Sequence, residues 1–373
     1  MKAIGIDIGT TSVCGVVIDV DSGEVLKSLT KNSNAFIKTE NEWEKIQSVD
    51  KIMETAMGIL EECIDADVVA IGVTGQMHGL VYTDENGEAV SPLYTWQDER
   101  GNLPYGDTTY AKHLKSFAGY GTVTDFYNRE NGQRPDSAVS FCTIHDYFVM
   151  KLCGLKCALM HASDAASYGC YDLKEHKFSY DVGVGVTADF AVAGMYKNIP
   201  VSVAIGDNQA SVFSTLADEN NILLNVGTGS QVSVISKNIS ESDDVETRPY
   251  FDGKYLIVGA ALCGGRAYSL LKNFYKEIFS YKGGASDDEV YSMMSEMLKG
   301  AKGTMAVDTR FAGTRKNPDL CGSITQITTE NFNPGELTHA LLCGMAQELY
   351  DMYKKMGEDK SGIVGSGNGV RKK

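Results

Sequence analysis

The order of apolar and polar positions predicts a β-meander at the start of the chain. Apolar runs at 3–8 and 13–19 flank the polar turn "GTTS" (9–12), and "DSG" (21–23) makes a second turn into a run near 25–30. Short apolar runs separated by glycine- and hydroxyl-rich turns are typical of antiparallel strands. We therefore expect three consecutive strands here.

Helical patterns follow the meander. Between residues 42 and 63 apolar residues recur on one helical face, which predicts an amphipathic helix over that whole range. Ser286 and Glu289 form an S-x-x-E capping box before an apolar-periodic run. Asn333 followed by Pro334 predicts another helix start. A mixture of strand meanders and long amphipathic helices favours an α/β fold.

One strand–turn–strand unit recurs in the second half of the chain. "LNVGTGSQVSVI" (224–235) aligns with "IDIGTTSVCGVV" (6–17) at an offset of 218 residues, with the apolar flanks in step. The matched turn residues are Gly9 with Gly227, Thr10 with Thr228 and Ser12 with Ser230. The repeat predicts two related domains, which we place at 1–216 and 217–373; a chance match of this short length is the alternative.

Both turns have the composition of a phosphate-binding loop. Glycine lets a ligand approach the backbone closely, and successive backbone N–H groups in such a turn form a concavity that suits phosphate oxygens. A plain β-hairpin is the alternative for either turn alone, and no Walker A lysine follows. Asp7 precedes the first turn, whereas Asn225 precedes the second. One carboxylate beside phosphate oxygens suits Mg²⁺. The phosphate candidates are Gly9, Thr10, Thr11, Ser12, Gly227, Thr228 and Gly229.

Two further glycine-bearing stretches are candidates for nucleotide and proton chemistry. "IVGSGNG" (363–369) is a strand running into a turn that could lie under an adenosine, or else a loose tail; its polar part is Gly365, Ser366, Gly367 and Asn368. "VAIGDNQASVFS" (203–214) is a strand that breaks at Gly206 and continues as a helix. Asp207 at that helix start is either an N-cap or a general base, and one residue can serve as both.

Aromatic and polar residues also gather in two loops. "TGQMHG" (74–79) follows a buried strand at 67–73, and "TWQDER" (95–100) holds Trp96, Asp98 and Arg100 within six residues. An aromatic ring against carbons and polar groups against hydroxyls suit a polyol. The alternatives are core packing for Trp96, a surface ion pair for Asp98 with Arg100, and a structural role for His78.

Charge and cysteine content exclude several classes of function. The formal net charge is −15 and we find no basic patch, which argues against nucleic acid or an anionic membrane as partner. No apolar stretch is long enough to span a bilayer, and Asp7 interrupts any signal-peptide core. Nine cysteines without a CxxC pair favour reduced, mostly buried thiols in a cytoplasmic protein, with a metal or redox role as the alternative.

Taken together, the motifs resemble the FGGY carbohydrate kinase family over the whole chain. "DIGTTS" and "NVGTGS" are similar to its two phosphate motifs, "GSGNG" to its adenosine motif and "GDNQAS" to its catalytic-aspartate motif. Four stretches look most like the family's sedoheptulokinases, and less like its xylulokinases: "GQMHG", "TWQDER", "TIHDYFVMKLCGL" (143–155) and "SDAASYG" (163–169).

The resemblance implies two actin-like (ribonuclease H-like) ATPase domains around a central cleft, the first binding sugar and the second binding ATP. It implies Asp207 as the base, with Asp7 and Asp207 at Mg²⁺. The expected sugar contacts are Gln76, Met77, His78, Trp96, Asp98, Arg100 and Asp207. The expected nucleotide contacts include Thr10, Thr11, Gly227, Thr228, Gly365 and Asn368.

The expected reaction is ATP-dependent phosphorylation of a ketose, first sedoheptulose to sedoheptulose 7-phosphate. A xylulokinase and a non-catalytic actin-like relic that only binds nucleotide are the alternatives, and a homodimer is left open. Family members continue past the adenosine motif, whereas this chain ends at Lys373. The resemblance therefore implies a C-terminal domain that is incomplete at its end.

Overall fold

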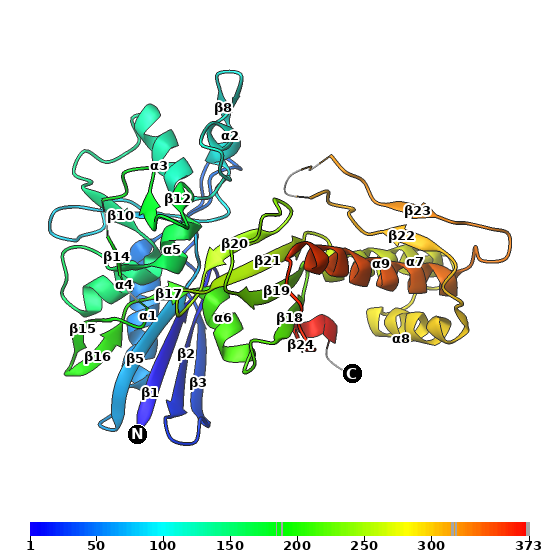
Figure 1. The fold of residues 1–373 in the computed structure, drawn as a ribbon, viewed down its shortest axis with the longest axis horizontal. Helices are drawn as coiled ribbons and strands as arrows, with labels where there is room; N and C mark the ends of the chain where they lie inside the picture. The colour runs from blue at the N-terminus through cyan, green and yellow to red at the C-terminus, as the bar shows by residue number, and fades with distance from the viewer. Residues whose placement is uncertain (184, 188, 315–316, 318, 371–373) are drawn as a thin grey trace. The chain divides into compact units, whose positions relative to one another are not determined.

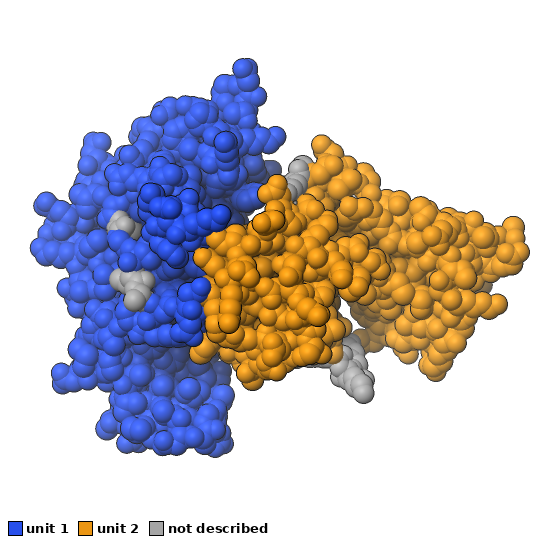
Figure 2. Space-filling view, in the orientation of Figure 1, with its two compact units in different colours: residues 1–211, 248–253 blue, residues 212–247, 254–373 orange. Residues whose placement is uncertain are grey.

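The fold was obtained as a computed structural model that describes residues 1–183, 185–187, 189–314, 317 and 319–370. It separates into two compact units, coloured in Figure 2: unit 1 holds residues 1–211 and 248–253, and unit 2 holds residues 212–247 and 254–373. The predicted boundary at 216/217 falls a few residues after this first division, and as a domain assignment it stays a prediction.

Unit 1 is built on a seven-stranded sheet (Figure 1). The predicted meander is confirmed, since β1 (Lys2–Ile8), β2 (Ser12–Asp19) and β3 (Val25–Asn32) pair antiparallel in sequence order. On its other side β1 pairs in parallel with β5 (Val68–Gly75). The sheet continues through β16 (Ile199–Ser202) to β15 (Val192–Tyr196), and β17 (Ile205–Gly206) also pairs with β5.

Helices and short ladders complete unit 1. Its helices are α1 (Val49–Cys63), α2 (Tyr110–His113), α3 (Gly121–Glu130), α4 (Ile144–Leu152) and α5 (Ala162–Ser167), and α6 (Asp207–Thr215) carries the chain on into unit 2. The two-stranded ladders are β4 (Ile46–Gln47) with β7 (Leu93–Tyr94), β6 (Val81–Thr83) with β10 (Ser140–Cys142), β8 (Pro104–Tyr105) with β9 (Thr108–Thr109), β11 (Met160–His161) with β14 (Val186–Thr187), and β12 (Tyr171–Asp172) with β13 (Lys177–Phe178).

The predicted helix over 42–63 is wrong in its first part. α1 begins at Val49 because Ser48 is its N-cap, and the Ser48 hydroxyl accepts a hydrogen bond from the backbone N–H of Lys51. Ile46, which falls on the apolar helical face by its spacing, is instead paired with Tyr94 in the β4–β7 ladder. Helical spacing alone did not distinguish a buried strand residue from a buried helix residue.

The core of unit 1 lies mainly on one face of the sheet. Ile4, Ile6 and Ile8 alternate along β1 with less buried residues, and they join α1 and α4 in a single apolar cluster. Because side chains alternate along a strand, Asp7 projects to the opposite face, where it is exposed. The fold therefore buries the apolar half of the first strand and leaves its carboxylate accessible.

Unit 2 repeats the arrangement of β1, β2, β3 and β5. β18 (Asn221–Val226), β19 (Ser230–Ser236) and β21 (Tyr255–Ala261) pair antiparallel, and β18 pairs in parallel with β24 (Gly362–Ser366). β20 (Glu246–Pro249) completes the five-stranded order β20–β21–β19–β18–β24. Both hairpins predicted from the internal repeat form, each with a three-residue loop, at residues 9–11 and 227–229.

Two helices of unit 2 start where their caps predict. α8 (Asp287–Met297) has the Ser286–Glu289 capping box, and α9 (Pro334–Lys355) has Asn333 as N-cap and proline in its first turn. The remaining elements are α7 (Gly264–Ser280), β22 (Ala306–Asp308), β23 (Ser323–Thr325) and the 3₁₀ turns η1 (Arg100–Asn102), η2 (Leu298–Gly300) and η3 (Asn368–Val370).

Within the described residues, no helix is both long enough and apolar enough for a membrane crossing.

All nine cysteines are free, but only Cys63, Cys142 and Cys263 are buried, while Cys157, Cys321 and Cys343 are exposed. The expectation of unpaired thiols is therefore confirmed, and the expectation that most of them are buried is wrong.

Candidate active site

Three parallel strands of unit 1 end at the same level. Ile8 of β1 is in register with Gly75 of β5, and Gly75 is in register with Gly206 of β17. The loops that follow these strands therefore start side by side at one edge of the sheet. They contain the first phosphate turn, the "GQMHG" loop and Asp207, three of the motifs singled out in the sequence. The carboxyl edge of parallel strands is where α/β folds bind ligands.

Hydrogen bonds connect the first turn to the "GQMHG" loop. The buried side chain of Gln76 donates from Nε2 to Oε1 of Gln47 (3.1 Å), and Gln47 donates from its own Nε2 to the carbonyl of Thr10 (2.6 Å). The backbone N–H of Gln76 also donates to the carbonyl of Ile8. Oε1 of Gln76 is buried and has no hydrogen-bond partner in the described part of the chain. Such an orphaned acceptor is the kind of group that a ligand hydroxyl can satisfy.

His78 is held in an uncommon backbone conformation. Its φ is 74°, in the left-handed region that side chains other than glycine rarely adopt. Its N–H donates to Oγ of Ser167 (3.1 Å), its ring stacks on Tyr120 (4.3 Å between centroids), and its Nδ1 lies 2.7 Å from the carbonyl of Ser167. Because a carbonyl only accepts, Nδ1 carries the proton, which in the neutral ring leaves Nε2 as an acceptor.

The residues of "TWQDER" separate into two environments. Trp96 is 46% exposed, so it is not a core residue, and its indole N–H donates to Oγ1 of Thr10 (3.0 Å). Asp98 and Arg100 are almost fully buried, and Nε of Arg100 donates to Oδ1 of Asp98 (2.7 Å). Arg100 also donates to Asn128. The alternative of a surface ion pair is therefore wrong, since the pair is buried, and a sugar contact by Asp98 or Arg100 stays a prediction.

Asp207 has the electrostatic properties of a base that works near neutral pH. α6 begins at Asp207, whose carboxylate is exposed and accepts a hydrogen bond from the N–H of Asn208. Although Asp207 keeps access to solvent, the protein around it removes much of the water near its carboxyl group and raises its pKa to about 6, and the negative charge of Asp7 adds to this rise. Desolvation likewise raises the pKa of Asp7. His145 opposes both shifts with its positive charge.

A buried cluster behind these carboxylates was not predicted as part of the site. His145, Asp146 and Asp164 are at most 1% exposed, and Nε2 of His145 lies 3.0 Å from Oδ1 of Asp164. Burial lowers the pKa of His145, but the charge and hydrogen bond of Asp164 outweigh it and the pKa rises to about 9. His145 is thus a cation behind Asp207. These three residues lie in the stretches "TIHDYFVMKLCGL" (143–155) and "SDAASYG" (163–169), for which no role was predicted.

Unit 2 brings its own turn next to the predicted adenosine stretch. In the β18–β24 ladder Asn225 is opposite Ser366, so the turn at 227–229 and the residues after Ser366 leave the same edge of the sheet. Gly367 has a φ of 86°, and a Cβ at this position would lie 2.5 Å from the carbonyl of Val226. The predicted strand forms, but it extends through Gly365 and Ser366, which we expected in the turn. The side chain of Asn368 lies outside the described part of the structure.

The start of α7 is a second feature that sequence reasoning missed. The N–H of Gly265 donates to the carbonyl of Gly227, and the N–H of Arg266 donates to the carbonyl of Thr228 (both 2.9 Å). The first turn of this 17-residue helix therefore rests directly on the glycine–threonine turn. The positive end of a helix dipole at that position favours anionic ligands. The signal in the sequence was the glycine pair at the start of "GGRAY".

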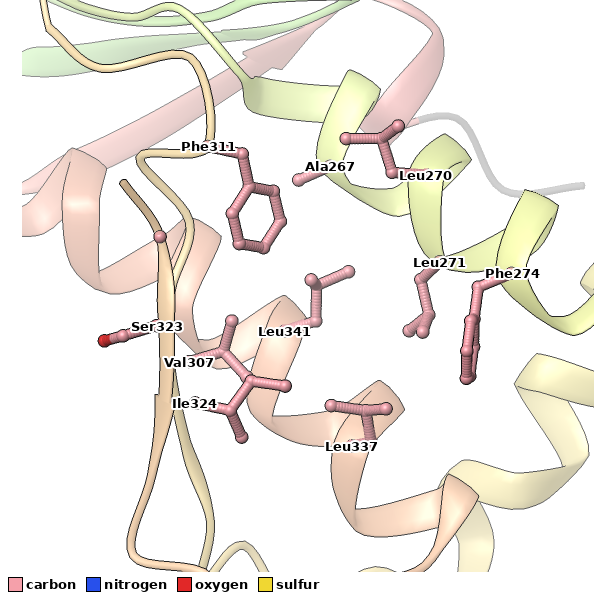
Figure 3. Close-up of a pocket in the computed structure, with 11 residues that line it drawn as sticks. Ala267, Leu270, Leu271, Phe274, Val307, Phe311, Ser323, Ile324, Leu337 and Leu341 are labelled. Carbon is pink, nitrogen blue, oxygen red and sulfur yellow. The ribbon is translucent and has the colours of Figure 1, made fainter. Parts of the chain in front are cut away.

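A separate apolar cavity of about 370 Å³ lies within unit 2 (Figure 3). α7, the β22–β23 hairpin and α9 line it, and its wall contains no charged side chain. The lining residues are Ala267, Leu270, Leu271, Phe274, Val307, Phe311, Gly322, Ser323, Ile324, Leu337 and Leu341. Ser323 brings the one side-chain hydroxyl among these lining residues and the others are apolar, so the wall suits neither a polyphosphate nor a polyol, and this cavity is not the candidate site.

Comparison with known proteins gives a consistent result. The family model for the N-terminal domain of the FGGY family of carbohydrate kinases matches residues 2–118. A sedoheptulokinase of Homo sapiens is 30% identical over 433 residues, which cover 98% of this chain and 89% of the relative. The crystal structure of xylulose kinase from Rhodospirillum rubrum superposes with a TM-score of 0.84 at 17% identity, covering 100% of this chain and 82% of that one. The crystal structure of Plasmodium falciparum glycerol kinase with ADP superposes with a TM-score of 0.78 at 18% identity, covering 98% of this chain and 81% of that one. These structures share the actin-like α/β fold expected from the sequence.

Proposed function

Because the chain belongs to the FGGY family of carbohydrate kinases, we propose that it transfers the γ-phosphoryl group of ATP to a terminal hydroxyl of a ketose, with Asp207 as general base. The observation that carries this proposal is that the parallel strands β1, β5 and β17 end in register at one edge of the sheet. This arrangement gathers a phosphate-type turn, a loop with an orphaned acceptor at Gln76, and Asp207 at one sheet edge.

In the proposed reaction Asp207 accepts the proton of the sugar hydroxyl. The hydroxyl oxygen forms a bond to the γ-phosphorus, the bond from that phosphorus to the β,γ-bridging oxygen breaks, and ADP leaves with the electron pair. The products are a sugar phosphate, ADP and a proton, first held by Asp207. General-base assistance of this kind contributes roughly 10²–10⁴-fold in rate. The remainder comes from positioning and from stabilisation of charge on the phosphoryl oxygens.

The candidate residues divide between the sugar, the phosphates and the adenosine. We assign the sugar to Gln76, Met77, His78 and Trp96 of unit 1, because Gln76 has a buried acceptor without a partner among the described residues and Trp96 offers an accessible ring. We assign the phosphates to Gly9, Thr10, Thr11 and Ser12 and to Gly227, Thr228 and Gly229, and the adenosine to Gly365, Ser366, Gly367 and Asn368. The N-terminus of α7, which is hydrogen-bonded to the second turn, adds a partial positive charge that favours phosphate.

A magnesium ion fits the carboxylates at this edge. Asp7 and Asp207 are exposed, the negative charge of Asp7 raises the pKa of Asp207, and carboxylate oxygens are the ligands that Mg²⁺ prefers. A divalent cation would relieve their mutual repulsion, so Asp7 and Asp207 would hold it. When bound, Mg²⁺ neutralises charge on the phosphate oxygens.

Sedoheptulose is the first candidate substrate. Support comes from the 30% identity to a sedoheptulokinase over nearly the whole chain, while xylulose is the second candidate because a xylulose kinase shares the fold. We place the reaction in the cytoplasm, since free cysteines, three of them exposed, suit a reducing compartment.

The test is ADP release from Mg-ATP with a panel of sedoheptulose, xylulose, ribulose and glycerol. We expect the highest kcat/KM with sedoheptulose. Asp207→Asn removes the base with little change in size, and we expect it to lower kcat by about 10²–10⁴-fold.

Asp50→Asn is the matched control, because Asp50 is also an aspartate in the first turn of a helix of unit 1, in this case α1. It should retain the turnover of the unmodified chain. Retained turnover in Asp207→Asn would remove Asp207 from the role of base, and a preference for xylulose would replace the first substrate with the second.

A further inference from the structure

The short helix α5 is hydrogen-bonded both to the end of β17, next to Asp207, and to His78 of the "GQMHG" loop. We propose that Ser163 and Ser167, four residues apart on α5, are positioning residues: Ser163 fixes the backbone that presents Asp207, and Ser167 fixes His78. This inference rests on the proposed function for the roles of Asp207 and His78. The contacts that support it all lie within unit 1.

Ser163 contacts the residue immediately before the proposed base. The backbone N–H of Gly206 donates to Oγ of Ser163 at 3.0 Å, and Ser163 is fully buried. On the other side of this short strand, Oγ1 of Thr74 donates to the carbonyl of Ile205 (2.8 Å). β17 is only two residues long, so these two side-chain hydrogen bonds supplement a very short ladder. Removing the Ser163 hydroxyl leaves the Gly206 N–H without its acceptor.

The orientation of the Ser163 hydroxyl is set by a further chain of hydrogen bonds. Nδ1 of the buried His161 accepts from the N–H of Ser163 (3.1 Å) and lies 2.8 Å from its Oγ. Since Nδ1 accepts from a backbone N–H, Nε2 carries the ring proton and donates it to Asp189 (2.8 Å). The Ser163 hydroxyl can then donate to Nδ1, which turns an oxygen lone pair toward Gly206.

Ser167 plays the corresponding part for the histidine. Its hydroxyl donates to the carbonyl of Asp164 (2.8 Å) and accepts from the N–H of His78 (3.1 Å). Its carbonyl lies 2.7 Å from Nδ1 of His78. A positive φ at a residue other than glycine persists only when the surroundings enforce it, and Ser167 supplies two of the contacts that do so here.

The two serines should therefore affect different kinetic constants. Misplacement of a reacting group by about 1 Å costs on the order of 100-fold in rate. We expect Ser163→Ala to lower kcat by roughly 10- to 100-fold with the ketose KM within about 3-fold. We expect Ser167→Ala to raise the ketose KM by about 3- to 10-fold, as for the loss of one hydrogen bond, with kcat nearly unchanged. If the two substitutions only loosened the packing of unit 1, kcat and KM would change in a similar way in both variants.

Hydrogen–deuterium exchange gives a second readout that does not require activity. In Ser163→Ala the Gly206 amide should exchange about 3- to 10-fold faster while the His78 amide is unchanged, and in Ser167→Ala the reverse should hold. Ser140→Ala is the matched control, because Ser140 is also a buried serine of unit 1, bonded to Thr83 (2.8 Å). It should leave both amides and both kinetic constants unchanged.

The outcomes separate this inference from the proposed function. Exchange at Gly206 and His78 that matches the Ser140→Ala control in both variants overturns the inference, as does an equal loss of kcat in both. Turnover retained in Asp207→Asn overturns the proposed function instead, while the exchange data still decide whether the serines fix these two backbone positions.

Discussion

The pH dependence of turnover gives the sharpest test of the assigned base. A general base accepts a proton only in its ionised form, so kcat/KM should follow the ionised fraction of Asp207. Desolvation and the charge of Asp7 raise the pKa of Asp207 to about 6, while His145, the Asn208 N–H and Arg248 oppose the rise. Because the pKa is raised, activity should be present above it and lost as the pH falls through it.

The magnitude follows from the ionised fraction. A carboxyl group with a pKa of about 6 is about 90% ionised at pH 7 and about 10% ionised at pH 5, so kcat/KM should fall roughly tenfold between them. A carboxyl at the ordinary value of 3.8 is still about 90% ionised at pH 5 and would give an almost flat profile. The two cases differ by about one order of magnitude.

A variant of His145 sharpens the test. The pKa of His145 is about 9, so its ring is positively charged throughout this pH range and lowers the pKa of Asp207. His145→Gln removes that charge. We expect the whole pH profile to move to higher pH, with less activity at pH 7 than in the unmodified chain.

The assay is initial-rate ADP release from pH 5 to 8 with Mg-ATP and the ketose both well below their KM values, so that kcat/KM reports the pKa of the free enzyme. The coupling enzymes are checked separately at each pH, and far-UV circular dichroism verifies that both proteins stay folded. A profile that is flat down to pH 5, or a shift of His145→Gln to lower pH, would refute the assignment of this pKa to the catalytic base.

Three further predictions concern packing. Arg100→Met should lower the free energy of unfolding by about 3–5 kcal/mol in urea titrations, because it leaves Asp98 buried without its cation, and Asp98→Asn in the same chain should restore part of the loss. Gly206→Ala should lower kcat in the ADP assay, since its Cβ would lie 2.6 Å from Sδ of Met77. Gly58→Ala, where a Cβ in α1 meets no atom within 4 Å, should instead raise the free energy of unfolding by about 0.5–1 kcal/mol, and a decrease would contradict the helix-propensity argument.

The sequence determined the features that depend on neighbours along the chain. The strand–turn–strand repeat, the capping box at Ser286 and the start of α9 at Asn333 are set by alternation, turn residues and side chains that bond to backbone within three residues. The same local information placed Asp207 at the junction of a strand and a helix. It failed at Ile46, where strand pairing with a distant residue competed with helical spacing.

Only the tertiary structure decided how these motifs work together. The bond from Gly206 to Ser163 spans 43 residues and the bond from His78 to Ser167 spans 89, so no local period contains them. The burial of Arg100 and the charge on His145 likewise depend on partners that arrive from other elements. Hydrogen bonding and desolvation act over a few ångströms in space whatever the separation along the chain, which is why the motifs could be found in the sequence but their geometry, burial and protonation could not.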